Sequence, residues 1–281
     1  MRPNVGIVGN GFVGSSIVSG FSLHANIMIY DKKPELSTHS LDEVVNLSDF
    51  IFVSVPTPMR NVRGGEIDLG IMNAAVSEIN EVNRRNDNVI IIKSTVVPGT
   101  VEEYVESYPS LNIVFSPEFL TERNAKLDFI NSARIILGGP DHLTDSVERM
   151  FRVRFPHTPI VKTDYATAQL IKYMANCFFA VKISFMNEMK QLADATGVNW
   201  EHAVRGFITD GRIGNSHIDV PGHDGSLGFG GKCFPKDINA LIYKSKSVGV
   251  KPTVLEATWH KNLEVRQELD WAEIEGAVTE K

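Results

Sequence analysis

The stretch Gly225-Ser-Leu-Gly-Phe-Gly-Gly-Lys-Cys233-Phe-Pro235-Lys-Asp237 combines residue types that could carry out nucleophilic chemistry. Cys233 directly follows a glycine-rich turn, and Pro235 favours a helix that starts here, because the first helical turn does not need the N–H that proline lacks. A thiol at a helix N-terminus lies near the positive end of the helix dipole, which favours the thiolate. Asp237 follows four residues later and would share a helix face with Cys233. The pattern indicates either an activated nucleophile beside a carboxylate or a buried structural cysteine next to a helix cap.

Length and composition narrow the class of protein. With 281 residues, 43% of them apolar and 22% charged, the chain is long enough for two domains and has the balance of a soluble globular protein. A net charge of −6 without any basic block argues against nucleic-acid binding. We see no signal peptide and no apolar run of the roughly 18 residues that a membrane span needs. The two cysteines fit neither a disulfide framework nor a zinc site. We therefore expect a cytoplasmic protein without a metal, and no nucleic-acid or membrane partner.

The N-terminal residues have the pattern of a dinucleotide-binding unit. An apolar strand over 4–9 runs into a glycine fingerprint, a helical stretch over 15–23 follows, and a second strand over 26–30 ends at Asp31. In this pattern one glycine permits a tight turn, the next lets the backbone approach a pyrophosphate, and the third lets helix and strand pack closely. The helix N-terminus supplies N–H groups to the phosphates. The residues predicted to form this cradle are Gly9, Gly11, Phe12, Val13 and Gly14.

The acid at the end of the second strand predicts which dinucleotide is bound. An aspartate at this position binds the ribose hydroxyls and repels a 2′-phosphate, so Asp31 favours NAD over NADP. Lys32 and Lys33 weaken this inference, because a basic pair could meet a phosphate. Lys32 is therefore also a candidate cofactor contact.

The alternation of strands and helices continues, which predicts a Rossmann-type doubly wound parallel sheet. Apolar strands are expected over 50–55, 88–93, 112–115, 133–138 and 158–162, with helices over 69–85 and 141–155. Residues 32–48 leave little room for a further element. Ligands bind open α/β sheets at the carboxyl ends of the strands, although a polar residue there can equally be a turn or helix-cap residue. The candidates by position are Thr57, Thr95, Glu118 and Glu122.

The pattern becomes helical after residue 163, so we predict a dinucleotide-binding domain over 1–163 and a helical central domain over 164–281. The expected elements of the second domain are one long helix over 164–196, a short helix after Trp200, an ordered glycine-rich loop over 215–232, a helix from the Cys233 segment to about Val248, and a final helix over 253–268.

The long helix carries a second candidate constellation. Lys172 and Asn176 are one turn apart, so an ammonium group and an amide project together and could stabilise an oxyanion. A solvated polar face is the alternative. Cys177 is about 100° further round the helix and is expected in the core.

Four motifs together resemble the UDP-glucose/GDP-mannose dehydrogenase family. In chain order they are Gly9–Gly14, Ser116-Pro-Glu-Phe-Leu-Thr-Glu122, Lys172-Tyr-Met-Ala-Asn176 and Gly228-Phe-Gly-Gly-Lys-Cys-Phe-Pro-Lys-Asp237, and the last is the most specific. The resemblance covers nearly the whole sequence. It implies that C6 of a nucleotide sugar is oxidised from alcohol to carboxylate with two NAD, through a thiohemiacetal and then a thioester on the cysteine. A homodimer through the helical domain is also expected.

The resemblance also implies roles for single residues. The catalytic residues would be Cys233 as nucleophile, Lys172 and Asn176 at the oxyanions, Asp237 and Thr95 at water, and Glu118 as the acid–base group of thioester hydrolysis. The cofactor contacts beyond the glycine cradle, Asp31 and Lys32 would be Thr57, Thr95, Glu122 and Lys236. The substrate contacts would be Glu118, Lys172, Asn176, Ser226, Gly230 and Arg212, the last reaching across a dimer.

The sequence departs from the family pattern at its end. The resemblance implies a third, nucleotide-sugar-binding α/β domain after the central one, which we expect to be absent here, so an active compact variant, half of a split enzyme and a non-catalytic remnant all stay open. The segments that begin at Arg212 and Val220 favour the UDP-glucose branch over GDP-mannose or a UDP-N-acetylhexosamine. A two-electron β-hydroxyacid dehydrogenase would have no need for Cys233. We expect the loop 215–226 to take over some substrate contacts.

Overall fold

The computed structural model describes residues 2–280, and the chain folds into two compact units. The first unit contains the residues up to Thr57 together with Leu69–Lys172. The second contains Pro58–Asp68 together with the residues from Tyr173 onward. The long helix α7 (Tyr165–Thr196) therefore begins in the first unit and ends in the second. None of the helices within the described residues is long and apolar enough to cross a membrane.

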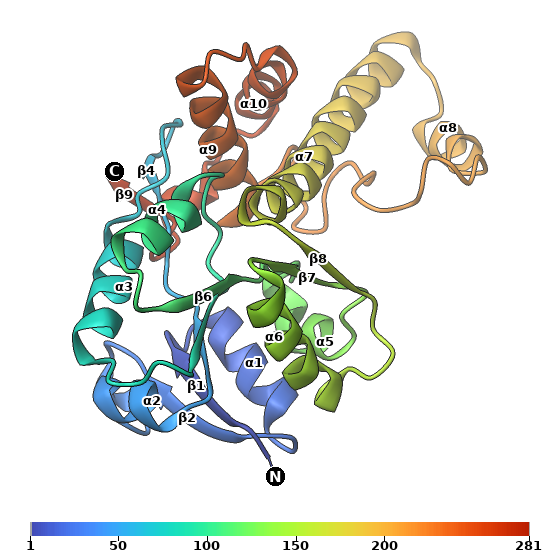
Figure 1. Ribbon diagram of the computed structural model, residues 1–281. Coiled ribbons are helices and arrows are strands. Elements are labelled where there is room, and N and C mark those ends of the chain that lie inside the picture. Colours follow the sequence, from blue (N-terminus) through green and yellow to red (C-terminus); the bar gives the residue numbers. More distant parts are fainter. Residues whose placement is uncertain (1, 281) are drawn as a thin grey trace. The chain divides into compact units, whose positions relative to one another are not determined.

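The first unit is built on a seven-stranded sheet with helices on both faces (Figure 1). Its strands are short and rich in Val, Ile and Phe, which fit a sheet that is covered on both sides. In spatial order they are β2 (Asn26–Tyr30), β1 (Asn4–Val8), β3 (Phe50–Val53), β5 (Val89–Ile92), β6 (Asn112–Phe115), β7 (Ile135–Gly138) and β8 (Ile160–Thr163). The chain crosses over between β2 and β3 on either side of β1, which opens a crevice at the carboxyl ends of β1 and β3.

Two apolar layers hold the helices against this sheet. One layer joins α2 (Leu41–Leu47), α3 (Gly70–Val82), α4 (Thr100–Ser107) and the start of α7 to one face. The other joins α1 (Phe12–Phe21), α5 (Ala125–Ile130) and α6 (Asp141–Arg154) to the opposite face. The second layer contains a group of packed phenylalanine rings centred on Phe21, whose ring centroid lies 5.8 Å from that of Phe151. Both faces are thereby shielded, so ligands approach the edge of the sheet rather than its faces.

The Rossmann-type class is confirmed, and three details differ from the sequence prediction. The first five strands in spatial order are parallel, but β7 pairs with β6 in the antiparallel direction through Phe115 and Gly138, and β8 follows β7. The polar stretch 32–48 contains a 3₁₀ turn (Pro34–Leu36) and α2, which the prediction left without an element. A capping box between Ser40 and Glu43 starts α2, so local hydrogen bonding rather than apolar periodicity defines it. The short helices α4 and α5 were also not predicted.

The second unit is mostly helical and includes a small parallel ladder. Its helices after α7 are α8 (Trp200–Phe207), α9 (Cys233–Ser247) and α10 (Thr253–Val265), and the ladder joins β4 (Met59–Asn61) to β9 (Val278–Glu280). The segment 58–68 is held in this unit by two indoles, because Trp259 Nε1 donates to Arg63 O at 3.1 Å and Trp271 Nε1 donates to Val62 O at 2.7 Å. The last helix ends at Val265, three residues before the predicted end. A tail with the buried Trp271 in a 3₁₀ turn (Asp270–Ala272) follows it.

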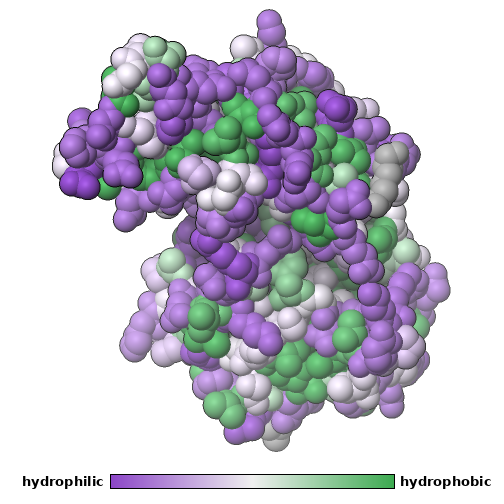
Figure 2. Space-filling view, turned by 180° about the vertical axis from the view of Figure 1, so that it is seen from behind, coloured by the Kyte–Doolittle hydropathy of each residue, from purple (hydrophilic) through white to green (hydrophobic). Residues whose placement is uncertain are grey.

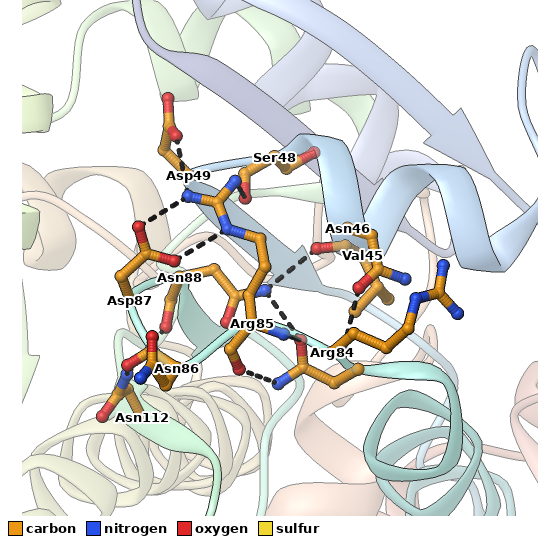
Figure 3. A network of polar contacts seen from close by, with 11 residues as sticks. Val45, Asn46, Ser48, Asp49, Arg84, Arg85, Asn86, Asp87, Asn88 and Asn112 are labelled. Atoms are coloured by element: carbon orange, nitrogen blue, oxygen red, sulfur yellow. Dashed lines mark hydrogen bonds and ion pairs between the residues drawn. The ribbon is translucent and has the colours of Figure 1, made fainter.

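A polar network closes the amino-terminal edge of the sheet (Figure 3). The Arg85 guanidinium contacts Asp87 at 2.8 Å, Asp49 at 3.4 Å and the carbonyl of Ser48 at 3.1 Å (Figure 3). The side chain of Asn88 donates to Val45 O at 2.9 Å. These contacts fasten the end of α2 and the start of β3 to the segment before β5. The network lies at the edge opposite to the crevice, so its role is to stabilise the fold.

Replacing Arg85 by alanine is expected to lower the free energy of unfolding by about 1–3 kcal/mol, because one carbonyl and two carboxylates lose a charged donor. Arg84→Ala is the matched control, since the Arg84 side chain is 65% exposed and its pair with Asp42 lies in solvent. Urea denaturation should separate the two variants. Equal midpoints for both variants would contradict this account of the network.

Candidate active site

The glycine fingerprint forms a cradle between β1 and α1. Gly9 has a φ of +91°, and a Cβ built on Gly14 would lie 2.1 Å from the Gly9 carbonyl oxygen, so neither position accepts a side chain. Gly11 is exposed and has no heavy atom within 4 Å of its would-be Cβ. Phe12 and Val13 are the half-buried first residues of α1. The open face at Gly11 and the N-terminus of α1 fit a pyrophosphate.

The acid that follows β2 faces this cradle. Asp31 Oδ2 accepts the N–H of Asn10 at 2.7 Å, and Asp31 Oδ1 accepts the N–H of Lys33 at 2.9 Å. Each oxygen keeps a lone pair that a ribose hydroxyl can use. Lys32 is exposed and lies 3.5 Å from Glu78, so its charge is partly compensated. The arrangement suits NAD, whose ribose lacks a phosphate.

Two glycine substitutions separate cofactor approach from packing. Gly11→Ala should leave the free energy of unfolding unchanged and weaken NAD binding at least about tenfold, because the added methyl group occupies only the face that a pyrophosphate approaches. Gly14→Ala should destabilise the fold by about 1–3 kcal/mol through the clash with Gly9. Calorimetric NAD titration and urea denaturation check both expectations. Unchanged NAD affinity in Gly11→Ala would exclude this cradle as the binding site.

A buried ion pair lies beyond the end of β6 in the first unit. Lys172 Nζ donates to Glu118 Oε1 at 2.8 Å and to the Glu118 carbonyl oxygen at 2.6 Å. The other carboxylate oxygen, Oε2, accepts the N–H of Leu120 at 2.6 Å. Both side chains are almost fully buried, with exposed fractions of 2% for Lys172 and 6% for Glu118. The carboxylate is thus fixed from both sides, and the ammonium group is held beside it.

The other candidates that follow the strands of the first unit differ in burial. Thr57 and Thr95 are buried and linked, since Thr57 Oγ1 donates to Thr95 O at 2.9 Å. Glu122 is exposed at the start of a 3₁₀ turn (Glu122–Asn124). The structure therefore joins Thr57 to Thr95 and Glu118 to Lys172. Among the described residues, Glu122 makes no hydrogen bond or ion pair with either pair.

The candidate nucleophile begins a helix in the second unit. Cys233 is the first residue of α9, as the sequence predicts, and it is half-buried. Four residues later, Asp237 is 1% exposed; its Oδ2 accepts the side-chain amide of Asn176 at 2.5 Å, and its Oδ1 accepts the ammonium group of Lys236. The structure thus brings Asn176, Lys236 and Asp237 together in the helix turn that Cys233 begins.

The second cysteine has a different environment. Cys177 is 3% exposed within α7, as predicted, and neither cysteine is in a disulfide. Burial, followed by the negative charge of Asp237, raises the pKa of the Cys177 thiol well above its usual range. Cys177 is therefore held as an unreactive thiol, and Cys233 is the candidate nucleophile.

The glycine-rich loop before Cys233 is fixed by side chains from α7, α10 and the tail. Asn262 bonds both backbone groups of Phe229, with its Oδ1 2.7 Å from the N–H and its Nδ2 3.0 Å from the carbonyl. The buried Arg266 pairs with Asp224 at 2.8 Å, and Asp270 accepts the N–H of Gly231 at 2.8 Å. Hydrogen bonds and an ion pair therefore hold the backbone of the loop that leads to the nucleophile.

The predicted substrate contacts in this loop and before it differ in their surroundings. A Cβ on Gly230 would lie 2.2 Å from Asp270 Oδ1 and 2.3 Å from Arg266 Nη2, so a side chain there would displace this ion pair. Ser226 closes a turn, in which its carbonyl accepts the N–H of Gly222 at 2.8 Å. Arg212 is 89% exposed and pairs with Asp210 at 2.5 Å. Sequence reasoning missed Asn262 and Arg266, although their spacing of one turn on a predicted helix was a signal.

Two family models match the chain. The NAD binding domain of the UDP-glucose/GDP-mannose dehydrogenase family matches residues 31–153, and the central domain of the same family matches residues 166–264. The UDP-glucose 6-dehydrogenase TuaD of Bacillus subtilis is 34% identical over 232 residues, which are 80% of this chain and 48% of that protein. The chain thus spans about half the length of the curated relatives it matches.

Solved structures agree with this fold. A UDP-glucose dehydrogenase from Pyrobaculum islandicum superposes with a TM-score of 0.81 at 26% identity, covering 94% of this chain and 68% of that one. The 3-hydroxyisobutyrate dehydrogenase of Mycobacterium tuberculosis has a TM-score of 0.76 at 16% identity over 96% of both chains, a likeness of fold alone.

Proposed function

Because the chain belongs to the UDP-glucose/GDP-mannose dehydrogenase family, with its NAD-binding and central domains, we propose that it oxidises C6 of a nucleotide sugar from alcohol to carboxylate. The observation that carries the proposal is Cys233 at the N-terminus of α9, in one helix turn with the buried Asp237 and its partner Asn176. An enzyme that removes only two electrons has no use for such a thiol. A four-electron oxidation needs it, because the aldehyde must stay bound between two hydride transfers.

Most of the proposed cofactor contacts come from the first unit. The glycine cradle and Asp31 fit its pyrophosphate and ribose, and bound NAD supplies the hydride acceptor for both oxidations. Thr57, Thr95, Glu122 and Lys236 are proposed as further cofactor contacts.

The protein side chains then divide the remaining work. Loss of a hydride from C6 and of the hydroxyl proton turns the alcohol into an aldehyde, and the Cys233 thiolate adds to its C6 to give the oxyanion of a thiohemiacetal. Loss of a second hydride from C6 of this oxyanion leaves a thioester. Lys172 and Asn176 donate hydrogen bonds to the oxyanion in these steps. Glu118 takes a proton from the water that attacks the thioester, and Asp237 and Thr95 hold that water. The C6–S bond breaks and Cys233 returns as thiolate.

The proposed substrate is UDP-glucose and the product UDP-glucuronate, since the curated relative TuaD and the Pyrobaculum structure carry that enzyme's name. Incubating the chain with NAD and a panel of sugar nucleotides, and measuring NADH formed per sugar consumed, tests this directly. Two NADH with a uronate product support the proposal. One NADH would indicate a simple two-electron dehydrogenase. No NADH would refute activity of the chain by itself, in favour of a split enzyme or a binding role.

We also propose a homodimer through α7. The helix exposes a stripe of large apolar side chains at Met174, Phe178, Phe185 and Leu192, each at least half exposed and spaced for one helix face. Figure 2 shows apolar surface between polar atoms over the helical unit. A long apolar stripe on a soluble fold is typical of a partner helix. The exposed Arg212 is proposed to reach a neighbour's substrate from such a dimer.

Phe178→Glu is expected to convert the dimer to a monomer, because the substitution places a charge inside the apolar stripe. Val248→Glu is the matched control: Val248 is equally exposed, in the same unit and outside the stripe, so this variant should stay dimeric. Light scattering after gel filtration gives the mass of each. A wild-type chain that is monomeric at all concentrations would exclude the proposal.

A further inference from the structure

The first unit contains a pocket that connects the protein surface to a buried lysine. The pocket has a volume of about 280 Å³ and is lined by the loop after β6, by α5, by the start of β7 and by α6. Thr121, Asn131 and Arg134 line it at the exposed end, while Lys93 and Glu118 line it in the interior. All of these residues belong to the first unit. The pocket, which apolar side chains also line, therefore leads from solvent to the carboxylate that is paired with Lys172, with polar groups at both of its ends.

Lys93 is an unusual residue at the end of a buried strand. The residue directly follows the buried strand Val89–Ile92 and is itself only 5% exposed. Nζ donates to Pro117 O at 3.0 Å and to Ser116 Oγ at 3.4 Å. A neutral amine has two N–H groups for these two acceptors, and its lone pair remains. The charged form has a third N–H, which donates to no acceptor among the described residues.

The charges around Lys93 are compatible with both its neutral amine and its ammonium form. Burial lowers the pKa of Lys93, the negative charge of Glu118 opposes this shift, and the positive charge of Lys172 adds to it, so that the pKa is about 7. At the mouth of the pocket Arg134 lies over the Phe119 ring at 4.1 Å, and Asp128 accepts the hydroxyl of Thr121. The lysine can thus gain and lose a proton near neutral pH.

The proposed reaction produces protons that must leave a site covered by its ligands. For RCH2OH + H2O + 2 NAD⁺ → RCOO⁻ + 2 NADH + 3 H⁺, three protons are released for each sugar. A site that retains an aldehyde must exclude bulk water on the side of the substrate. The protons then need another way out, and the pocket ends at Glu118, the group proposed to take one of them.

We propose that this pocket is the proton exit of the site and that Lys93 is the relay between Glu118 and solvent. The inference rests on the proposed function. A protonated Glu118 carboxyl gives its proton, through water in the pocket, to the lone pair of the Lys93 amine. The ammonium group then passes a proton to water at the pocket mouth, which restores both the carboxylate and the amine. Lys93 is in this scheme a positioning and relay residue that does not touch the substrate.

The relay is tested with two substitutions at one position. Lys93→Arg keeps a cation and hydrogen-bond donors but cannot release a proton near neutral pH, whereas Lys93→Ala removes the group and opens space. Both variants should lose kcat by at least about tenfold. Small primary amines should restore kcat in Lys93→Ala, more strongly for amines that titrate near the assay pH, and should not restore it in Lys93→Arg. Ala133→Trp in the Lys93→Ala background should block this rescue, since Ala133 lines the pocket and is exposed.

Two outcomes would overturn the relay while leaving the proposed function intact. One is wild-type kcat in Lys93→Arg, which would make Lys93 a structural cation. The other is a Lys93 side chain whose NMR resonance in the purified chain shows no titration below pH 10. A wild-type chain that forms no uronate from any sugar nucleotide would instead refute the proposed function itself.

Discussion

Cys233→Ser should abolish net uronate formation, lowering kcat at least about a thousandfold, while NAD affinity and the free energy of unfolding stay at their original values. The reason is chemical: a serine hydroxyl at the N-terminus of α9 is not ionised near neutral pH and cannot hold the aldehyde as a thiolate does. The side chain is half-buried and the two residues differ by one atom, so the fold should not respond. Chromatography quantifies the uronate that each variant forms, and NAD titration measures its affinity for the cofactor.

The protein contains its own control for this substitution. Cys177→Ala removes the only other thiol, which is buried in α7 and whose pKa is raised by burial. This variant should keep kcat within about threefold and lose only a modest amount of stability. Uronate formed at the original rate by Cys233→Ser, or lost equally in both variants, would contradict a covalent route through Cys233.

Lys172→Met should have the largest effect on stability among the candidate residues. It leaves the Glu118 carboxylate buried without its ammonium partner, which costs about 3–5 kcal/mol of unfolding free energy. The same variant should lose about a hundredfold to a thousandfold in kcat, because one oxyanion donor is missing. Chemical denaturation and steady-state kinetics give the two numbers separately.

The double variant Lys172→Met/Glu118→Gln distinguishes the two roles. It removes both charges, so most of the lost stability should return, while activity should not. A double variant that recovered activity along with stability would mean that the pair only supports the fold. A single Lys172→Met variant with unchanged stability would show that the pair is not buried in solution.

The sequence was sufficient for those parts of the fold that follow a regular pattern. The glycine fingerprint with Asp31, the apolar strands and the apolar period of α7 each gave an element that the structure contains. Pro235 and the glycine turn correctly located the start of α9 at Cys233. These signals are local and strong, because they depend on backbone geometry and on burial of one face.

Other elements depend on contacts that a single sequence does not display. The helix α2 begins with a capping box in a polar stretch. The antiparallel pairing of β7 with β6 depends on the direction in which the chain returns to the sheet. Pairing of β4 with β9 joins residues more than two hundred positions apart. The two strand pairings have no compositional signal, whereas the Ser40-x-x-Glu43 capping box is a local sequence signal that the prediction did not use.

The candidate site shows the same division. Helical spacing made Lys172, Asn176 and Asp237 recognisable as candidates. Their partners became clear only in three dimensions, where Lys172 pairs with Glu118 and Asn176 pairs with Asp237. Lys93 was read as the last residue of an apolar strand. Only its burial and its place in a pocket indicate a function.

The central claim is that C6 becomes covalently attached to Cys233, and intact-protein and peptide mass spectrometry test it most directly. The Glu118→Gln variant should retain the steps up to the thioester and hydrolyse it slowly, since the amide cannot take a proton from water. Quenched during turnover with UDP-glucose and NAD, it should carry one nucleotide-sugar acyl group per chain on the peptide that contains Cys233. An unmodified Cys233 peptide, in a sample that has already formed two NADH per sugar, would contradict the account.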